Sequence, residues 1–156
     1  MEVKIRPLEP ADALTSVKWR NDPEVFKYTG SVYTHTITLE NEIEWVNRVI
    51  GNVDEYRCAI IADGKYVGNI YLTGIHDGEA EYHIFIGDKS FWGKGVAKMA
   101  SQLIIKHGFE NLYLTRINLS VRPQNTAALR LYQNLGFRET SRDADFIHMT
   151  LQKTND

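Results

Sequence analysis

Cysteine is almost absent from this sequence of 156 residues, because Cys58 is its only example. A single thiol excludes an internal disulfide and is typical of proteins from a reducing compartment such as the cytoplasm. The run Ala-Ile-Ile-Ala at 59–62 predicts that Cys58 is a small buried side chain and not a nucleophile. The five histidines show no ligand spacing either, so we expect no metal site.

The sequence also lacks a large excess of charge of either sign, and it has no long apolar run. The formal net charge is only -2 at pH 7, with no basic stripe, so we expect no nucleic-acid partner. The apolar runs are far shorter than the roughly 20 residues of a membrane-spanning helix. Residues 1–6 lack the apolar core of a signal peptide. These absences favour a cytoplasmic protein with no membrane partner.

The remaining composition is that of an ordinary globular protein, and the length suits one domain over residues 1–156. Helix spacing and stop signals predict helices at 13–20, 25–28, 96–110 and 126–135 and another between the caps Thr38 and Gly51, with Asp12 capping the first. Alternating patterns predict strands at 3–6, 56–62, 65–75, 79–87, 115–121, 138–141 and 146–151. This order predicts an α+β fold with α/β/α layers, in which a largely antiparallel mixed sheet of about seven strands is flanked by about four helices.

The segment Phe-Trp-Gly-Lys-Gly-Val-Ala at 91–97 joins a predicted strand to the predicted helix 96–110. Gly93 and Gly95 leave the backbone open to close approach by a ligand. The start of the helix adds unpaired N–H donors and the positive end of the helix dipole. Together these features favour a phosphate site, although a Gly-x-Gly segment alone is more often only a tight turn.

A second motif lies at 125–137, where Asn125 is followed by Tyr132 and then by Gly136 and Phe137. Asn125 is placed to cap the helix and to reach a ligand beside its start. Tyr132 lies two turns further along the same helix face. Taken alone, Asn125 would be only a cap and Tyr132 only a core residue.

The two motifs, in this order and with a strand between them, resemble the GNAT acetyltransferases. The likeness covers essentially the whole chain and is closest to the branch of nucleotide-sugar amino-acetyltransferases and ribosomal-protein N-terminal acetyltransferases. Gly95 and Ala97 match the pyrophosphate signature of the family, whereas Trp92 stands where Arg or Gln is usual. The resemblance implies the GNAT fold and acetyl-CoA as co-substrate. It also implies CoA contacts from the predicted strand 79–87, the segment 91–97 and the motif at 125–137. The residues are Ile84, Phe85, Ile86, Trp92, Gly93, Lys94, Gly95, Val96, Ala97, Asn125 and Arg130.

The resemblance also implies catalytic roles. Tyr132 is expected to protonate the departing CoA thiolate, since a phenol with a reference pKa near ~10 is protonated at neutral pH. The backbone N–H of Phe85 is expected to polarise the thioester carbonyl. Glu81 is our candidate for the base that deprotonates the attacking amine, with His83 or a water relay as alternatives. Glu81 and His83 lie on the same face of a strand, and the competing interpretation is that they form only a polar strand face.

The acceptor is the least determined part. The segment Trp-Arg-Asn-Asp-Pro at 19–23 resembles the acceptor side of the same enzymes, so Arg20, Asn21 and Tyr28 are candidate acceptor contacts, with Arg20 suited to an anion such as a nucleotide phosphate. Alternatively, 21–24 is only a helix start. We expect an N-acetyltransferase for a primary amine of a small molecule, for example an amino-sugar nucleotide. A protein N-terminus as acceptor and a non-catalytic acyl-CoA-binding module are the alternatives, and an exposed terminal strand suggests a homodimer.

Overall fold

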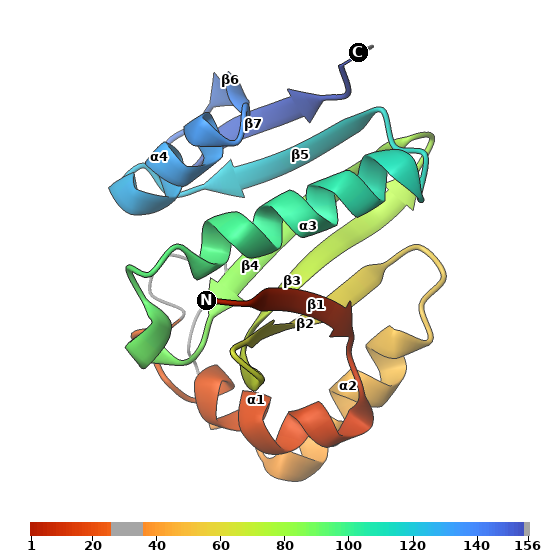
Figure 1. The fold of residues 1–156 in the computed structure, drawn as a ribbon, viewed down its shortest axis with the longest axis vertical. Helices are drawn as coiled ribbons and strands as arrows, with labels where there is room; N and C mark the ends of the chain where they lie inside the picture. The colour runs from red at the N-terminus through yellow and green to blue at the C-terminus, as the bar shows by residue number, and fades with distance from the viewer. Residues whose placement is uncertain (26–35, 155–156) are drawn as a thin grey trace.

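The computed structural model describes residues 1–25 and 36–154, and their strands form one seven-stranded mixed sheet (Figure 1). The strand order is β1-β2-β3-β4-β5-β7-β6, and among these strands only β4 and β5 pair in parallel. The strands are β1 (Val3–Pro7), β2 (Tyr56–Ala62), β3 (Lys65–His76), β4 (Glu79–Ile86), β5 (Arg116–Val121), β6 (Arg138–Arg142) and β7 (Ile147–Gln152). The helices are α1 (Ala13–Arg20), α2 (Leu39–Ile50), α3 (Val96–Glu110) and α4 (Thr126–Asn134), with 3-10 turns η1 (Pro10–Asp12) and η2 (Lys89–Phe91). The helix predicted at 25–28 lies, apart from Val25, outside the described residues.

Two of the three predicted helix caps are confirmed. The Thr38 hydroxyl accepts from the Asn41 N–H at 3.1 Å, and the Asn125 amide oxygen accepts from the Ala128 N–H at 3.2 Å. The predicted side-chain cap at Asp12 is wrong, because Asp12 already has helical backbone angles where η1 runs into α1. Its carboxylate instead accepts from the Glu9 N–H and pairs with Arg6.

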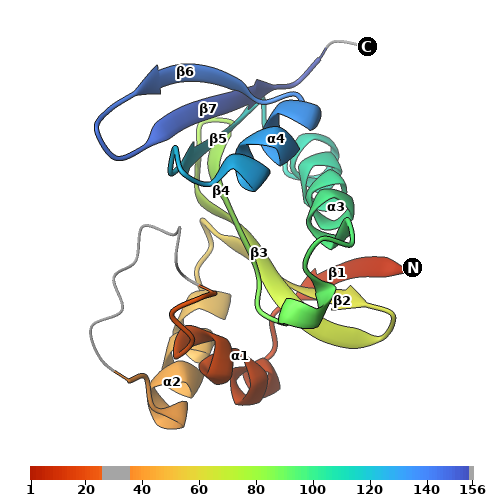
Figure 2. The same cartoon turned by 90° about the vertical axis from the view of Figure 1, so that its left-hand side faces the viewer.

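Helices cover both faces of the sheet (Figure 2). On one face α3 and α4 bury the main core, in which side chains such as Ile60, Ile70 and Ile104 are fully inaccessible. Burial of each such side chain stabilises the fold by roughly 1.5–3 kcal/mol. Cys58 belongs to this core, which confirms the prediction that its side chain is buried, and burial raises the pKa of its thiol to about 11. On the other face, α1 and α2 pack over β2 and β3.

The sheet opens between β4 and β5. These strands pair only from Glu79 with Arg116 to Glu81 with Asn118, although β4 continues to Ile86 and β5 to Val121. Beyond this last pair, β4 has no neighbouring strand on its β5 side, and backbone groups there are left for another partner. The glycine turn follows directly after this unpaired end of β4. No helix in residues 1–25 and 36–154 combines the length and apolar character needed to cross a bilayer.

Candidate active site

The glycine turn has the open geometry that phosphate binding requires. Gly93 and Gly95 have φ angles of 72° and 81°, in the left-handed region that favours glycine. No heavy atom lies within 4 Å of the position that a Cβ would occupy at either residue, so the space above the turn is free. Trp92 fixes the turn against the end of β4, because its indole N–H donates to the Ile86 carbonyl at 2.8 Å. The residue that replaces the usual Arg or Gln therefore serves the turn itself.

A continuous row of N–H groups faces this space. The N–H groups of residues 93–98 have no hydrogen-bond acceptor within the described chain, and Gly95 caps α3 without a side-chain hydrogen bond. The first N–H with a regular helical partner is that of Met99, which donates to Gly95. These donors lie at the positive end of the 15-residue helix α3, where an anionic group is stabilised. Lys94 is exposed beside them and supplies the only charged side chain of the turn. The turn is therefore chemically suited to a pyrophosphate.

The register of β3 and β4 determines which backbone groups face the opening. Phe85 lies opposite Asn69, and the Gly87 N–H donates to the Val67 carbonyl at 2.8 Å. Because N–H groups alternate in direction along an antiparallel strand, that of Phe85 points to β3, while those of Ile84 and Ile86 point to the opening. The Phe85 N–H is therefore directed away from the opening, where its two neighbours are the better placed donors.

Tyr132 of α4 lies close to the opening. Its side chain is almost buried and packs edge-on against Tyr82 of β4, with ring centres 5.6 Å apart. The hydroxyl forms no hydrogen bond within the described residues but is not sealed from solvent. Burial raises the pKa of Tyr132 to about 12. The phenol is therefore protonated at neutral pH and has a hydrogen to donate.

Tyr82 is held rigidly beneath Tyr132. Its hydroxyl is hydrogen-bonded to Ser101, which in turn donates to the Ala97 carbonyl in the first turn of α3. All three groups are buried or nearly so, and a fully satisfied buried network of this kind restricts side-chain movement. The network fixes the distance between the start of α3 and the ring on which Tyr132 rests. Asn125 keeps its amide NH2 free of partners in the described chain, and Arg130 is exposed further along α4.

Glu81 and His83 lie side by side on the opposite face of β4. The Glu81 carboxylate is 3.8 Å from His83 Nε2, which is also 3.1 Å from the Thr73 hydroxyl. Burial is the main cause that lowers the pKa of His83, and Arg57 adds to it, while Glu81 and Glu55 act in the opposite direction. The imidazole is therefore neutral at pH 7 and has a lone pair able to take a proton.

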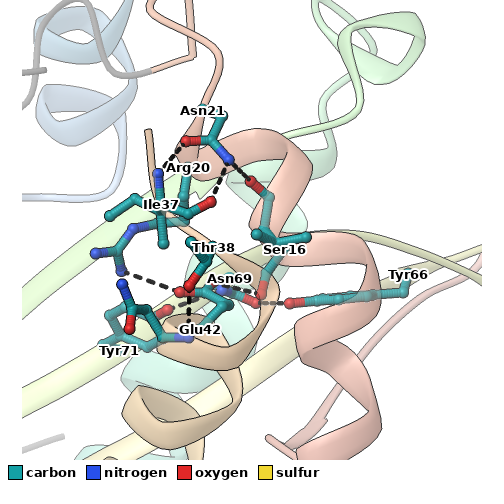
Figure 3. Close-up of polar contacts among 11 residues, drawn as sticks. Ser16, Arg20, Asn21, Ile37, Thr38, Glu42, Tyr66, Asn69 and Tyr71 are labelled. Atoms are coloured by element: carbon teal, nitrogen blue, oxygen red, sulfur yellow. Dashed lines mark hydrogen bonds and ion pairs between the residues drawn. The ribbon is translucent and has the colours of Figure 1, made fainter. Parts of the chain in front are cut away.

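Arg20 and Asn21 are the two acceptor candidates that the structure describes, and both have partners within the protein (Figure 3). Asn21 donates to the Val17 and Ile37 carbonyls and accepts from the Ile37 N–H, so its amide holds together the chain on both sides of residues 26–35. Arg20 lies 3.8 Å from the buried Glu42 carboxylate, and its charge is compensated there. The predicted role of Arg20 as an anion site therefore competes with an ion pair, and Tyr28 lies outside the described residues.

Glu42 lies at the centre of the polar cluster in Figure 3. One of its oxygens accepts from the Ser16 hydroxyl at 2.7 Å, while the other has no hydrogen-bond partner. Below it, Asn69 accepts from Tyr66 and donates to Tyr71. Burying a carboxylate is costly unless it is paired, so the Arg20 contact and the Ser16 hydrogen bond both help to keep α1 and α2 together.

Two cavities meet at the point where β4 and β5 part. One, of about 220 Å³, is lined by Glu81, Asn118, Leu119, Ser120, Thr140, His148, Met149 and Thr150. The other, of about 330 Å³, is lined by Thr73, Gly74, His76, Glu79, Ala80, Glu81 and Asn118. Sequence reasoning missed every lining residue of β5, β6 and β7. The alternation of polar and apolar residues at 116–121 and 147–152 was an available signal that these strands have a polar face.

The fold and the site together are typical of an acyl-CoA-binding α/β protein, with a turn suited to a pyrophosphate beside an open parallel strand pair. The model of the acetyltransferase (GNAT) domain matches residues 2–138. The chain belongs to the GNAT acetyltransferase family.

Similar proteins agree with this membership. The chain is 30% identical to spermidine N(1)-acetyltransferase of Escherichia coli K12, over 86% of this chain and 72% of that protein. It is 26% identical to the acetyltransferase PseH of Campylobacter jejuni, over 88% and 84%. Its fold is similar to that of spermidine N-acetyltransferase from Vibrio cholerae, solved with CoA and spermine, with a TM-score of 0.87, 24% identity and coverage of 96% and 95%. The expected GNAT fold, the acyltransferase class and the use of acetyl-CoA are confirmed.

Proposed function

We propose that this enzyme transfers the acetyl group of acetyl-CoA directly to a primary amine of a small molecule, which enters on the sheet face that carries Glu81. The observation that carries the proposal is the row of unpaired N–H groups at 93–98, next to the unpaired end of β4. A pyrophosphate on that row and a pantetheine arm along β4 account for both sets of free donors. Asn125 and Arg130 lie on α4, on the other side of the opening from β4, where their side chains would meet the same arm or the nucleotide.

The reaction forms one C–N bond and breaks one C–S bond. Acetyl-CoA supplies the thioester, and the amine nitrogen attacks its carbonyl carbon. The N–H groups of Ile84 and Ile86 are the donors suited to the oxyanion that then develops. When the C–S bond breaks, its electron pair goes to sulfur, and Tyr132 donates its proton to the CoA thiolate. An acceptor that arrives as ammonium loses one proton to the base before it attacks and a second as the tetrahedral intermediate collapses, so it ends as a neutral amide, while Tyr132 regains a proton from solvent.

In this proposal, Glu81 binds the acceptor amine and His83 deprotonates it. The Glu81 carboxylate, which lines both cavities, attracts the ammonium form of the acceptor. His83 takes the proton, because its lowered pKa leaves the imidazole neutral and therefore able to accept. Asp or Glu alone would be a weaker base at its ordinary pKa near ~4.

Small amines are the acceptors that the relatives' names support. One relative is a spermidine acetyltransferase and another is PseH, so we infer that this chain also acts on a small-molecule amine. A protein N-terminus as acceptor, a cytoplasmic location and a homodimer through the exposed strand β6 stay predictions. Sedimentation of the purified protein tests the homodimer.

The function is tested by release of CoA thiol on addition of a library of amines, followed by mass spectrometry of the products. We expect a product heavier by one acetyl group for at least one small amine. Labelled acetyl that stays on the protein would contradict direct transfer. Tight binding of acetyl-CoA without turnover on any amine would instead favour the non-catalytic acyl-CoA-binding module.

A further inference from the structure

The two cavities differ in chemistry from the turn that suits CoA. The first lies over β5, β6 and β7 and the second over β3 and β4, and Glu81 and Asn118 line both. Hydroxyls, an amide and imidazoles dominate their polar side chains, contributed by Thr73, His76, Asn118, Ser120, Thr140, His148 and Thr150. This is the surface that an acceptor meets before it reaches the thioester.

The charge on this surface fits a ligand with a single positive group. No lysine or arginine is among the described residues that line either cavity, so a phosphate or carboxylate would find only imidazoles and neutral donors among them. Of the two lining carboxylates, Glu79 is already engaged by Arg116 at 3.4 Å and by the Asn118 amide at 3.3 Å. Among the described residues, the Glu81 carboxylate has a single charged neighbour in ion-pair range, His83 at 3.8 Å. One carboxylate is thus available for one ammonium group, whereas a polyamine needs several.

The hydroxyl groups are oriented to receive hydrogen bonds. Thr150 donates to the side-chain amide oxygen of Asn118 at 2.7 Å, and Thr140 donates to the backbone carbonyl of His148 at 3.3 Å. Ser120 is 2.8 Å from His148 Nδ1, and Nε2 of the same ring is 2.9 Å from Asp143. A hydroxyl whose hydrogen is already donated in this way keeps its lone pairs, and these accept hydrogen bonds from the hydroxyl groups of a ligand.

The cavities also give a scale for the part of a ligand that they hold. The first has a volume of about 220 Å³ and the second of about 330 Å³, near or below the lower end of the roughly 300–1,000 Å³ of pockets that enclose a drug-sized molecule. Each accommodates a group the size of one sugar ring, and both are open to solvent.

We propose that the acceptor is a small polyhydroxylated monoamine of the free amino-sugar class. Its amine lies at Glu81, and its hydroxyl groups donate to Ser120, Thr140 and their neighbours in the first cavity. This inference rests on the proposed function, since it assigns the acceptor of that same reaction. It differs from the expected amino-sugar nucleotide in leaving out the phosphate.

The first experiment compares amines as substrates of the wild-type enzyme. The probes are glucosamine, cyclohexylamine as a ring of similar size without hydroxyls, spermidine, and a nucleotide-linked amino hexose. Rates are measured at several pH values and expressed per neutral amine, because hydroxyl groups lower the pKa of an amine. We expect kcat/KM for glucosamine to exceed that for cyclohexylamine by at least about tenfold and to exceed those of the other two probes.

The second experiment removes hydroxyls from the cavity. Ser120→Ala and Thr140→Val should lower kcat/KM for glucosamine by roughly 3- to 30-fold and leave that for cyclohexylamine unchanged. Ser141→Ala is the matched control, because Ser141 is the exposed neighbour of Thr140 on β6 and lines neither cavity. An equal loss for both amines would mean a structural role and would overturn the assignment.

The outcomes separate the two proposals. Preference for spermidine or for the nucleotide-linked sugar would overturn the acceptor class while acetyl transfer to a small amine stands. Equal rates with glucosamine and cyclohexylamine would do the same. If no amine is acetylated although acetyl-CoA binds, the proposed function fails and the acceptor class fails with it.

Discussion

The two sides of the β4–β5 opening are built in different ways. The side that suits CoA consists mainly of backbone N–H groups from one continuous segment, the end of β4 and the turn before α3. The side that we propose for the acceptor consists of side chains from four strands, with Glu81, Asn118, Thr140 and His148 each on a different one. A backbone site recognises a generic anion and needs only glycine and a helix start. A side-chain site can be changed one residue at a time, so we expect specificity for the acceptor to be determined there.

The largest effect should come from Gly95→Glu. A side chain at φ 81° is strained, and the added carboxylate repels phosphate, so acetyl-CoA binding measured by calorimetry should be lost with the fold retained. Gly64→Glu is the matched control, because Gly64 has φ 80° and equally open space in the β2–β3 turn. Unchanged affinity for acetyl-CoA in Gly95→Glu would contradict the assignment of the turn.

Tyr132→Phe should separate catalysis from binding. Only the hydroxyl is removed, so kcat should fall by roughly 10- to 1,000-fold while the dissociation constant for acetyl-CoA changes little. The raised pKa, about 12, keeps the phenol protonated, and kcat should therefore show no loss from this group as pH rises through the ordinary tyrosine value near ~10. Tyr113→Phe on the exposed Tyr113 serves as control. An unchanged kcat, with chemistry shown to limit the rate, would return Tyr132 to the core.

A smaller and pH-dependent effect should come from the pair on β4. His83→Gln should lower kcat roughly 10- to 100-fold at neutral pH, with partial recovery at high pH where the amine is already neutral. Since the pKa of His83 is lowered, the acid limb of kcat in the wild type should lie below ~6.5 and vanish in the variant.

Glu81→Gln should mainly raise KM for the amine, and Glu79→Gln, on the same strand face, is the control. If Glu81→Gln removes the acid limb and His83→Gln does not, Glu81 is the base. If neither variant changes the profile, the proton leaves through water.

The smallest effect should come from Lys89, whose ammonium ties the segment before the glycine turn to the segment after α1. It lies 2.8 Å from the Asp22 carboxylate and 2.7 Å from that of Glu24, and so joins η2 to the segment after α1. Lys89→Met should raise KM for the acceptor slightly at low salt and leave kcat unchanged, with the exposed Lys106→Met on α3 as control. Because exposed ion pairs are screened, the difference from wild type should disappear at high salt. A difference that persists at high salt would mean that Lys89 acts through packing.

Most of the helices and strands were predictable from the sequence, and so were the turn at 91–97 and the position of Tyr132 in the site. The helix predicted at 13–20 has these bounds in the structure, and the caps at Thr38 and Asn125 form as expected. The contacts that the sequence did not predict share one cause. Asn21 and Arg20 stay predicted acceptor contacts, but their partners in the structure, Ile37 and Glu42, lie beyond residues 26–35, and no local pattern reports such contacts. The direction of the Phe85 N–H depends on the register with β3, which local spacing also leaves open.

By itself, the sequence determined the turn at 91–97, the helix that begins after it and the position of Tyr132 on α4. These features depend on φ preferences, caps and helical spacing within a few residues. Only the tertiary structure decided that β4 and β5 part after Glu81 and Asn118, and that residues of β6 and β7 complete a cavity there. The reason is that strand register and separation are set by burying both faces of the sheet at once. That requirement joins residues far apart in the chain, and it acts only when the whole sheet is assembled.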